Sequence, residues 1–419
     1  MTGWRRRVPG ARRPIFSKTY SPTGKIEMSA SLLIERFDLA DPDLQANPFP
    51  FYPLLRENHP VLKTAFFGRP CWVLSRRKDV SAVLMDTRGF SSRTTPIDIL
   101  LFSDPPEHGR LRKMVADHFT RSAVAVRSEQ IGRAATELYE RCLEKGDCDG
   151  IDDFASPLTI RMMSLLLGIT EGQAGDVREL SVLLAEAAQA RRIGVSPSPE
   201  VANASATIAD LILGIVSNRS YAPDGVIAPL ADRYRAGELT SGQLIEFATL
   251  LFVAGHSTTT NLIGNTLYSI AQRPTDLERM RAEAGWIESY IEEVLRTRPS
   301  FHRVLRITTR DIELHGVSIP AGSLIMLMLA AANLDSATSE SGDAFEPDAK
   351  GRAHLAFGQG IHTCLGSWLA RLESRIALEV VAARTAALRL SSEDPPTPFV
   401  GGTFNEFGFQ RLPMTVTRL

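Results

Sequence analysis

The hydrophobic and polar positions of the chain follow a helical period over most of its length. The longest continuous pattern runs from Leu244 to Gln272 and is apolar nearly all round, which is typical of a helix at the centre of a protein. A second long pattern extends from Leu365 to about Leu388, and residues 123–240 read as amphipathic helices with polar breaks at 145–147 and 195–199. The sequence therefore predicts a mainly helical fold.

Two shorter regions carry strand signals. Between residues 31 and 93 the pattern predicts two helices and two paired strands: Phe51–Asn58, Arg77–Met85, Val61–Phe67 and Cys71–Leu74. Turn residues at 68–70 join these strands. A strand-like run from Arg303 to Asp311 leads into a hairpin-rich segment that ends near Gly322. We therefore expect a minor β-region beside the helices.

Composition places the chain among ordinary globular proteins. Of its 419 residues 44% are apolar and 23% are charged, and a net charge of −1 gives no indication of nucleic acid or an anionic membrane as a partner. The most apolar stretch, Phe247–Gly255, is too short to span a membrane. The few, irregularly spaced cysteines favour a reducing cytoplasm over a disulfide framework. They are Cys71, Cys142, Cys148 and Cys364.

The first thirty residues differ from the rest of the chain. Arginines lie there among Gly, Pro, Ser and Thr, a composition that cannot bury a core. We predict a disordered basic tail over 1–30, with Met28 as a candidate natural start, and a single domain over 31–419.

One short stretch carries the strongest chemical signal: Phe357-Gly358-Gln359-Gly360-Ile361-His362-Thr363-Cys364-Leu365-Gly366. Its cysteine follows two glycines and precedes a helix, so backbone N–H groups and the helix N-terminus favour a thiolate. Such a thiolate suits haem iron. The alternatives are a small core cysteine, a zinc ligand and a nucleophile paired with His362. A zinc site is disfavoured because only two ligands, His362 and Cys364, are present. A nucleophilic cysteine is disfavoured because these two residues are too close in one tight loop to form a thiolate–imidazole pair.

This stretch resembles the haem-binding loop of the cytochromes P-450, Phe-Gly-x-Gly-x-His/Arg-x-Cys-x-Gly, and all of its fixed positions are met. The resemblance implies that Cys364 binds the iron of heme b (iron protoporphyrin IX) and that Phe357, His362 and Gly366 contact the cofactor. It also implies the cytochrome P-450 fold over about residues 31–419, with haem between the long central helix and the helix after the cysteine loop.

A second phrase of the family is met at Asp104-Pro105-Pro106-Glu107-His108-Gly109-Arg110-Leu111-Arg112-Lys113. The prolines predict a helix start, so His108 and Arg112 fall on one face, where they can meet two carboxylates; a solvated basic face is the alternative. By resemblance, His108, Arg112 and Arg306 bind the haem propionates. Arg110 and Lys113 point elsewhere and are candidates for docking an acidic electron-transfer partner.

The central helix contains Ala254-Gly255-His256-Ser257-Thr258-Thr259, which resembles the oxygen-activation motif Ala-Gly-x-Asp/Glu-Thr. Because hydroxyl residues compete for backbone carbonyls, we predict a local opening of the helix here, with a packing accident as the alternative. By resemblance, Thr258 supports dioxygen and its protonation. Ser257 departs from the family's carboxylate, and a hydroxyl does not supply a proton by itself at neutral pH. Water, His256 or the substrate would then deliver protons.

Glu293 and Arg296 form an ExxR signal, which alone is usually a surface ion pair. Its place in the chain resembles the family's buried pair behind the haem loop. The third partner in the family, an arginine, is replaced here by Ala349, and Lys350 and Arg352 are the candidates to compensate.

Residues expected beside the substrate come from several segments. The loop between Arg93 and Asp104 is short for the family, which predicts an open pocket mouth. In the family, the helices around a break such as the one at 195–199 form a mobile lid over the substrate. Arg191 and Arg192 precede this break and are candidates to attract an acidic substrate or partner, with a solvated helix end as the alternative. Arg303, beside the expected substrate position, would also favour an acidic substrate. The expected pocket residues are Ile97, Ala254, Gly255, Phe301, His302, Arg303, Val304 and Phe404.

The resemblance implies a monooxygenase that uses dioxygen and two electrons from an external ferredoxin and NAD(P)H-linked ferredoxin reductase. It predicts a monomeric, cytoplasmic, bacterial-type enzyme without membrane or nucleic-acid partners. Such an enzyme would tailor specialised metabolites, including acidic or carrier-protein-tethered substrates. Two alternatives stay open: a non-standard P-450 that uses peroxide or performs coupling, motivated by Ser257, and a non-catalytic haem-binding protein.

Overall fold

The computed structural model describes residues 34, 37–38, 41–66, 68–95, 99–169, 183, 196, 198–335, 342–349, 353–399 and 405–419. Several predictions fall outside these ranges. They concern the tail 1–30 with Met28, the pocket residues Ile97 and Phe404, the pair Arg191 and Arg192, and the compensating candidates Lys350 and Arg352.

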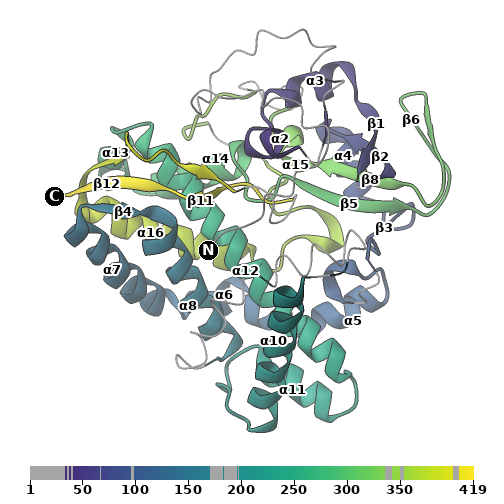
Figure 1. The fold of residues 1–419 in the computed structure, drawn as a ribbon, viewed down its shortest axis with the longest axis horizontal. Helices are drawn as coiled ribbons and strands as arrows, with labels where there is room; N and C mark the ends of the chain where they lie inside the picture. The colour runs from purple at the N-terminus through teal and green to yellow at the C-terminus, as the bar shows by residue number, and fades with distance from the viewer. Residues whose placement is uncertain are drawn as a thin grey trace.

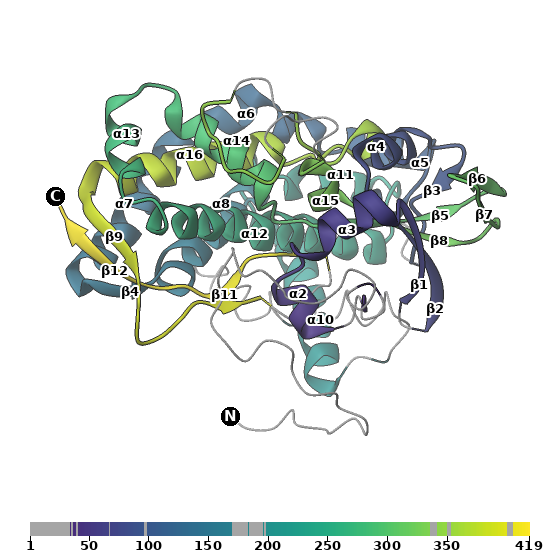
Figure 2. The same cartoon turned by 90° about the horizontal axis from the view of Figure 1, so that it is seen from above.

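One long helix, α12 (Ser241–Ala271), runs through the middle of the molecule, as the pattern from 244 to 272 predicts (Figures 1 and 2). It begins with a capping box: the Thr240 hydroxyl accepts the N–H of Gln243 at 3.1 Å, and the Gln243 side chain accepts the N–H of Thr240 at 3.0 Å. These bonds satisfy N–H groups that have no partner inside the helix. The helix therefore starts at a defined residue and holds a fixed register against its neighbours.

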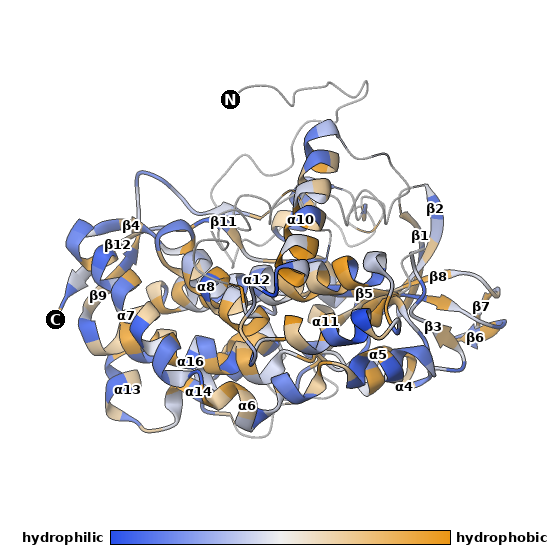
Figure 3. Cartoon of the chain, turned by 90° about the horizontal axis from the view of Figure 1, so that it is seen from below, coloured by the Kyte–Doolittle hydropathy of each residue, from blue (hydrophilic) through white to orange (hydrophobic). Residues whose placement is uncertain are grey.

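The other helices pack against α12 in two hydrophobic cores. The first core lies among α7 (Ser128–Lys145), α8 (Ser156–Leu167), α14 (Trp286–Thr297) and α16 (Ser367–Arg384). The second surrounds the N-terminal half of α12, where hydrophobic residues of α10 (Pro199–Ser217) and α11 (Ile227–Arg235) meet it (Figure 3). Both faces of α12 are thereby fixed, which makes it a rigid support for a site.

The main sheet has five strands in the order β1-β2-β8-β5-β3. They are β1 (Val61–Phe66), β2 (Arg69–Leu74), β8 (Leu324–Met328), β5 (Arg303–Thr308) and β3 (Phe90–Ser91). Side chains of β2 alternate between two cores: Cys71 and Val73 pack on one face, and Trp72 and Leu74 pack on the other. The two predicted strands and their pairing are confirmed, and the pairing is antiparallel, but the second strand begins at Arg69, inside the segment predicted as a turn.

Three small sheets lie elsewhere. They pair β4 (Asp147–Asp149) with β12 (Pro413–Arg418) and β9 (Thr385–Leu390), β6 (Ile312–Leu314) with β7 (Val317–Ile319), and β10 (Thr397–Pro398) with β11 (Phe409–Arg411). The prediction that the helix after the cysteine extends to about Leu388 is wrong. Helix α16 ends at Arg384, because the following residues form β9 and pair with β12.

The remaining elements are short. The helices are α2 (Pro42–Ala46), α3 (Phe51–Asn58), α4 (Arg77–Met85), α5 (Glu107–Lys113), α6 (Arg121–Ala125), α13 (Asp276–Ala282) and α15 (Leu329–Asn333). Single 3-10 turns occupy Leu100–Phe102, Ala116–Phe119 and Gly360–His362, and a π-helical turn occupies Gly150–Ala155. The bounds of α3 and α4 match the sequence prediction.

Helix α10 is long and apolar enough to cross a membrane by length and composition, the one such helix in the described part of the chain. Its mean hydropathy is 1.3, so the expectation that no run approaches a membrane span is wrong by these two measures. A third of its most apolar window (33%) is buried, and Ile208, Ile212 and Ile215 pack in the core beside α12. One face of α10 is thus committed to protein packing.

Candidate active site

The cysteine loop folds back on itself before α16. The N–H of Cys364 donates to Phe357 O at 2.8 Å, and the N–H of Gly358 donates to Leu355 O at 2.8 Å. Gly360 has φ +76°, and a Cβ there would lie 2.7 Å from the backbone oxygen of Leu84 in α4. Only glycine therefore fits this close approach.

The thiol of Cys364 is a protonated group in the protein alone. The side chain keeps accessible surface, yet protein surrounds it, and this burial raises the pKa of the thiol above its usual value. The N–H of Gly366 and the guanidinium groups of Arg112 and Arg371 oppose that rise. The thiolate of the iron-bound protein stays a prediction, supported by the Gly366 N–H and the two guanidinium groups that lower this pKa. Binding of a metal cation removes the proton from a coordinating thiol.

A cationic cluster lies beside this thiol, and it consists of His108, Arg112, Arg306 and His362. The rings of His108 and His362 have centres 4.2 Å apart, and His362 Nε2 lies 2.9 Å from the Ser92 hydroxyl. Burial lowers the pKa of His362 to about 3, assisted by Arg306, His108 and Arg112. Residues from α5, β5 and the cysteine loop, predicted separately, therefore meet in one place.

The two arginines of this cluster have no carboxylate within ion-pair distance among the described residues. Arg306 is almost fully buried, its Nη1 donates to Leu305 O at 2.8 Å, and burial lowers its pKa to about 10, opposed by Asp104. Burial also lowers the pKa of Arg112, opposed by Cys364. One buried and one half-buried guanidinium group call for an anion, and two carboxylates would suit them.

The middle of α12 is shaped by a close packing contact. A Cβ on Gly255 would lie 2.3 Å from the Met163 sulfur of α8. Ser257 and Thr258 donate to the carbonyls of Val253 and Ala254 at 3.0 and 2.7 Å. The predicted local opening of the helix is wrong, because α12 is continuous here and the hydroxyls bond the carbonyls four residues back.

His256 does not share the face of Thr258. Its Nδ1 lies 2.9 Å from the hydroxyl of Thr159 in α8 and 3.4 Å from that of Thr260. This buried polar contact joins two helices. We therefore no longer expect His256 to deliver protons.

A carboxylate that the sequence reasoning missed lies next to Ser257. Glu406 accepts a hydrogen bond from the Ser257 hydroxyl at 3.1 Å and one from the Asn261 amide at 3.2 Å. No local signal identifies it, since Ser257 and Glu406 are 149 positions apart. A stripe of polar residues at a spacing of four on α12, namely Ser257, Asn261 and Asn265, was the available hint.

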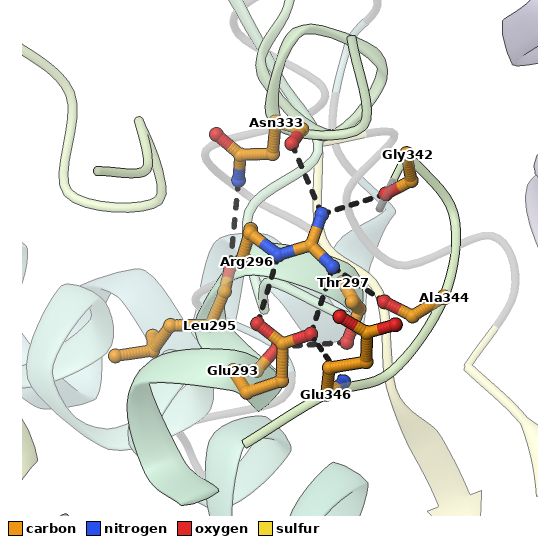
Figure 4. A network of polar contacts seen from close by, with 8 residues as sticks. All are labelled: Glu293, Leu295, Arg296, Thr297, Asn333, Gly342, Ala344 and Glu346. Carbon is orange, nitrogen blue, oxygen red and sulfur yellow. Dashed lines mark hydrogen bonds and ion pairs between the residues drawn. The ribbon is translucent and has the colours of Figure 1, made fainter. Parts of the chain in front are cut away.

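Glu293 and Arg296 form the buried ion pair that the resemblance predicts (Figure 4). Two hydrogen bonds of 2.8 Å join them. The guanidinium also donates to Gly342 O at 2.8 Å and to Ala344 O at 2.6 Å, and the N–H of Glu346 donates to Glu293 at 2.7 Å. The third partner in the family is an arginine, and Ala349 stands at its position here. Backbone groups of the segment 342–346 bond the pair instead.

The expected pocket residues divide into two groups. Ala254 is exposed in the middle of α12, with Gly255 partly so, while Val304 packs against the core on one face of the main sheet. Phe301 pairs with Glu406 through a backbone bridge. Two others are fully buried away from solvent: His302 beside Tyr52, and Arg303, whose charge faces the same tyrosine.

The residues present fit heme b. Arg112 and Arg306, which have no described carboxylate partner, suit its two propionates, with His108 and His362 beside them, and the thiol suits its iron. The guanidinium carbon of Arg371 lies 4.5 Å from the centre of the Phe357 ring. Gly366 is the N-cap residue of α16. The donor set therefore matches a haem-thiolate site.

Comparison with known proteins agrees with this geometry. A family model described as Cytochrome P450 matches residues 223–399. Cytochrome P450 109 of Bacillus spizizenii is 34% identical over 88% of this chain and 92% of that relative, and erythromycin C-12 hydroxylase of Saccharopolyspora erythraea is 33% identical over 81% and 87%. P450BioI, in its complex with a hexadec-9Z-enoic acid ligated acyl carrier protein, superposes with a TM-score of 0.78 at 27% identity over 89% of this chain and 100% of that one.

The chain belongs to the cytochrome P450 family. It has the cytochrome P450 fold, its cofactor is heme b, and it is an oxidoreductase of the bacterial monooxygenase type.

Proposed function

We propose that the protein oxidises a small organic molecule with dioxygen and two electrons, which an external ferredoxin and its NAD(P)H-linked reductase deliver in the cytoplasm. Its place would be the tailoring of specialised metabolites. Similarity to erythromycin C-12 hydroxylase supports that role. The observation that carries the proposal is the meeting of Cys364 with the cationic cluster, since Arg112 lies within electrostatic reach of the thiol.

Each residue of the site has a distinct task in this proposal. Haem, when bound, supplies the redox chemistry that activates dioxygen. Cys364 would hold the iron, and the N–H of Gly366 would donate to the sulfur and moderate its charge. Arg112 and Arg306 would hold the propionates.

Thr258 would orient the oxygen substrate and accept or pass protons. Its hydroxyl hydrogen is committed to Ala254 O at 2.7 Å, so the lone pairs of its oxygen can accept a further hydrogen bond. Ala254 lies one turn earlier on the same face of α12 and has an apolar side chain. Thr258 would therefore offer the reactants a polar contact, and Ala254 an apolar one.

The electron-transfer partner would dock near the cysteine loop. Trp368 lies four residues after Cys364 and is 45% exposed, and the Arg121 guanidinium lies 5.4 Å from its ring centre. Arg110, expected to join this surface, is paired with Glu107 at 2.6 Å and has less charge to offer than Lys113. Arg121→Glu should raise the KM for spinach ferredoxin and leave peroxide-driven turnover unchanged.

An acid tethered to a carrier protein is the substrate class that we favour. The support is the likeness to P450BioI, whose structure holds a fatty acid on an acyl carrier protein. Arg303 does not add to it, because its guanidinium lies in the core beside Tyr52. Palmitic acid, palmitoyl acyl carrier protein and palmitamide can be compared by the spin-state change on binding; a response to palmitamide alone would exclude the acid.

The carbon monoxide difference spectrum of the reduced protein tests the haem-thiolate assignment. The wild type should show the band typical of a thiolate ligand, and Cys364→Ala should lose it. Cys142→Ala, at a cysteine buried in the helical core, is the control and should keep it. A Cys364→Ala protein that kept the band would disprove the ligand assignment. A wild type with the band but no turnover with any electron source would favour the non-catalytic alternative.

A further inference from the structure

A carboxylate from near the C-terminus meets α12 at Ser257 and Asn261. Glu406 Oε1 accepts from the Ser257 hydroxyl at 3.1 Å, and its Oε2 accepts from the Asn261 amide at 3.2 Å. The residue is 9% exposed. Both carboxylate oxygens are therefore held by one face of the helix, one residue away from Thr258.

The segment around Glu406 is anchored on both sides. The Asn265 amide donates to Phe407 O at 3.3 Å, and the N–H of Phe407 donates to Ser300 O at 2.9 Å. A Cβ on Gly408 would lie 2.2 Å from the Asn261 amide oxygen, so the backbone passes the helix as closely as glycine allows. The position of this carboxylate is fixed by the fold and does not depend on a surface rotamer.

The described elements next to Glu406 carry several titratable groups. On α12, His256 is turned toward Thr159 of α8. At the start of β5, the N–H of His302 donates to Asn405 O at 2.7 Å, and Arg303 is buried next to it. Arg298 lies 5.2 Å from the ring centre of Phe407.

We propose that Glu406 is the acid of this site, in place of a carboxylate at position 257, and that it acts through Ser257. A protonated Glu406 would give its proton to Ser257 Oγ, and the Ser257 hydroxyl proton, which bonds Val253 O in the resting protein, would pass to a water molecule beside it. Glu406 is left as a carboxylate and regains a proton from solvent. A hydroxyl alone can pass a proton but not supply one, whereas a carboxyl does both. The inference rests on the proposed function, and Glu406 is a positioning residue because it works through another side chain.

Moving the acid tests the idea. Glu406→Gln should lower the share of NADPH electrons recovered in oxidised product by about tenfold or more, with spinach ferredoxin and reductase as electron source and thioanisole as probe. Ser257→Asp in the Glu406→Gln background returns a carboxyl to the same spot from α12 and should restore most of that loss. Glu406→Asp should restore part of it. Glu246→Gln, a glutamate of α12 far from Ser257, is the control and should change nothing.

Two further readouts separate a proton role from a structural one. Hydrogen peroxide brings its own protons, so Glu406→Gln should oxidise thioanisole at the wild-type rate when peroxide is the oxidant. Independently of turnover, the infrared spectrum of the wild type should contain a protonated-carboxyl band that is lost as the pH is raised and is absent from Glu406→Gln. Where thioanisole is a poor substrate, this infrared comparison decides.

The outcomes distinguish the two proposals. Loss of the thiolate-type carbon monoxide band in the wild type would defeat the proposed function, whatever Glu406 does. An intact band with equal electron recovery in wild type and Glu406→Gln, or with no infrared band that depends on Glu406, would overturn the acid role alone. Equal loss in the reductase-driven and peroxide-driven reactions would also overturn it, since that result indicates general damage.

Discussion

The phenol oxygen of Tyr52 lies 2.6 Å from Nδ1 of His302, and both side chains are completely buried. The His302 ring also stacks on Phe407 with 4.3 Å between ring centres. Helix α3, the start of β5 and the segment that carries Glu406 are thus joined at one imidazole. Burial lowers the pKa of His302 well below its usual value, and Arg303 and Arg298 add to the effect, so the ring is neutral.

Stability should therefore fall as the pH falls below the ordinary histidine value of about 6.5. Below that pH the unfolded chain binds a proton at His302 that the folded protein does not, so acid favours unfolding; above it the term vanishes. His302→Gln should have a flatter dependence of the urea midpoint between about pH 8 and 5. His59→Gln, at the end of the same helix α3, should follow the wild type. Parallel curves for the wild type and His302→Gln would contradict this expectation.

The buried pair Glu293–Arg296 should be intolerant of losing one partner. Arg296→Ala leaves a buried carboxylate with fewer partners and should cost about 3–5 kcal/mol, seen as a large drop in thermal midpoint or as loss of folded protein. Arg133→Ala removes an exposed partner of Glu129 in α7 and should change stability by less than about 1 kcal/mol. Similar losses for the two variants would mean that backbone donors around Glu293 replace the guanidinium.

Local signals allowed much of this architecture to be predicted. The bounds of α3 and α4 follow from turn residues and apolar spacing within a few positions of each end, and the cysteine loop is a contiguous phrase. Features that depend on distant partners could not be predicted in the same way. Residues 385–390 have a helical pattern but are held as a strand by β12.

The same limit applies to the candidate site. His108, Arg112, Arg306 and His362 were identified from separate motifs, and the fold brings them together. The direction of His256 could not be predicted, because it depends on Thr159 in another helix. The acid at Glu406 was missed for a similar reason, since its neighbours on α12 are remote in sequence.

Gly255 should resist substitution more than other helical glycines. An added Cβ would lie 2.3 Å from the Met163 sulfur, and the Met163 side chain is buried with little room to move. Gly255→Ala should therefore cost about 1–3 kcal/mol through overpacking. Gly214→Ala in α10, where nothing lies within 4 Å, should be neutral or stabilising by up to about 1 kcal/mol.

A second-site change separates packing from function at this glycine. Met163→Ala in the Gly255→Ala background should recover part of the lost thermal midpoint, because it removes the atoms that the new methyl group meets. The carbon monoxide difference spectrum reports in parallel whether the cofactor site survives. A Gly255→Ala protein as stable as Gly214→Ala would show that α8 and α12 can shift apart at low cost.

Haem retention should depend on Arg112 and Arg306, which lack a described carboxylate partner. Each charge-assisted hydrogen bond to a propionate contributes about 1.5–3 kcal/mol, so Arg112→Ala or Arg306→Ala should speed haem transfer to apomyoglobin by roughly ten- to a hundredfold. Arg306→Ala should have the larger effect, because Arg306 is more deeply buried than Arg112. Lys113→Ala, on the exposed side of the same helix α5, is the matched control and should transfer haem at the wild-type rate.

The arginine variants also report on protein stability without cofactor. Arg306 is a buried cation and Arg112 a half-buried one, and neither has a described carboxylate partner, so their removal should relieve a desolvation cost in the apoprotein while it weakens the holoprotein. The expected signature is a smaller gap between the thermal midpoints of the two forms, with the apoprotein unchanged or more stable. Faster haem loss together with an equally destabilised apoprotein would instead mean that the arginines support the fold, and the propionate assignment would then have to be withdrawn.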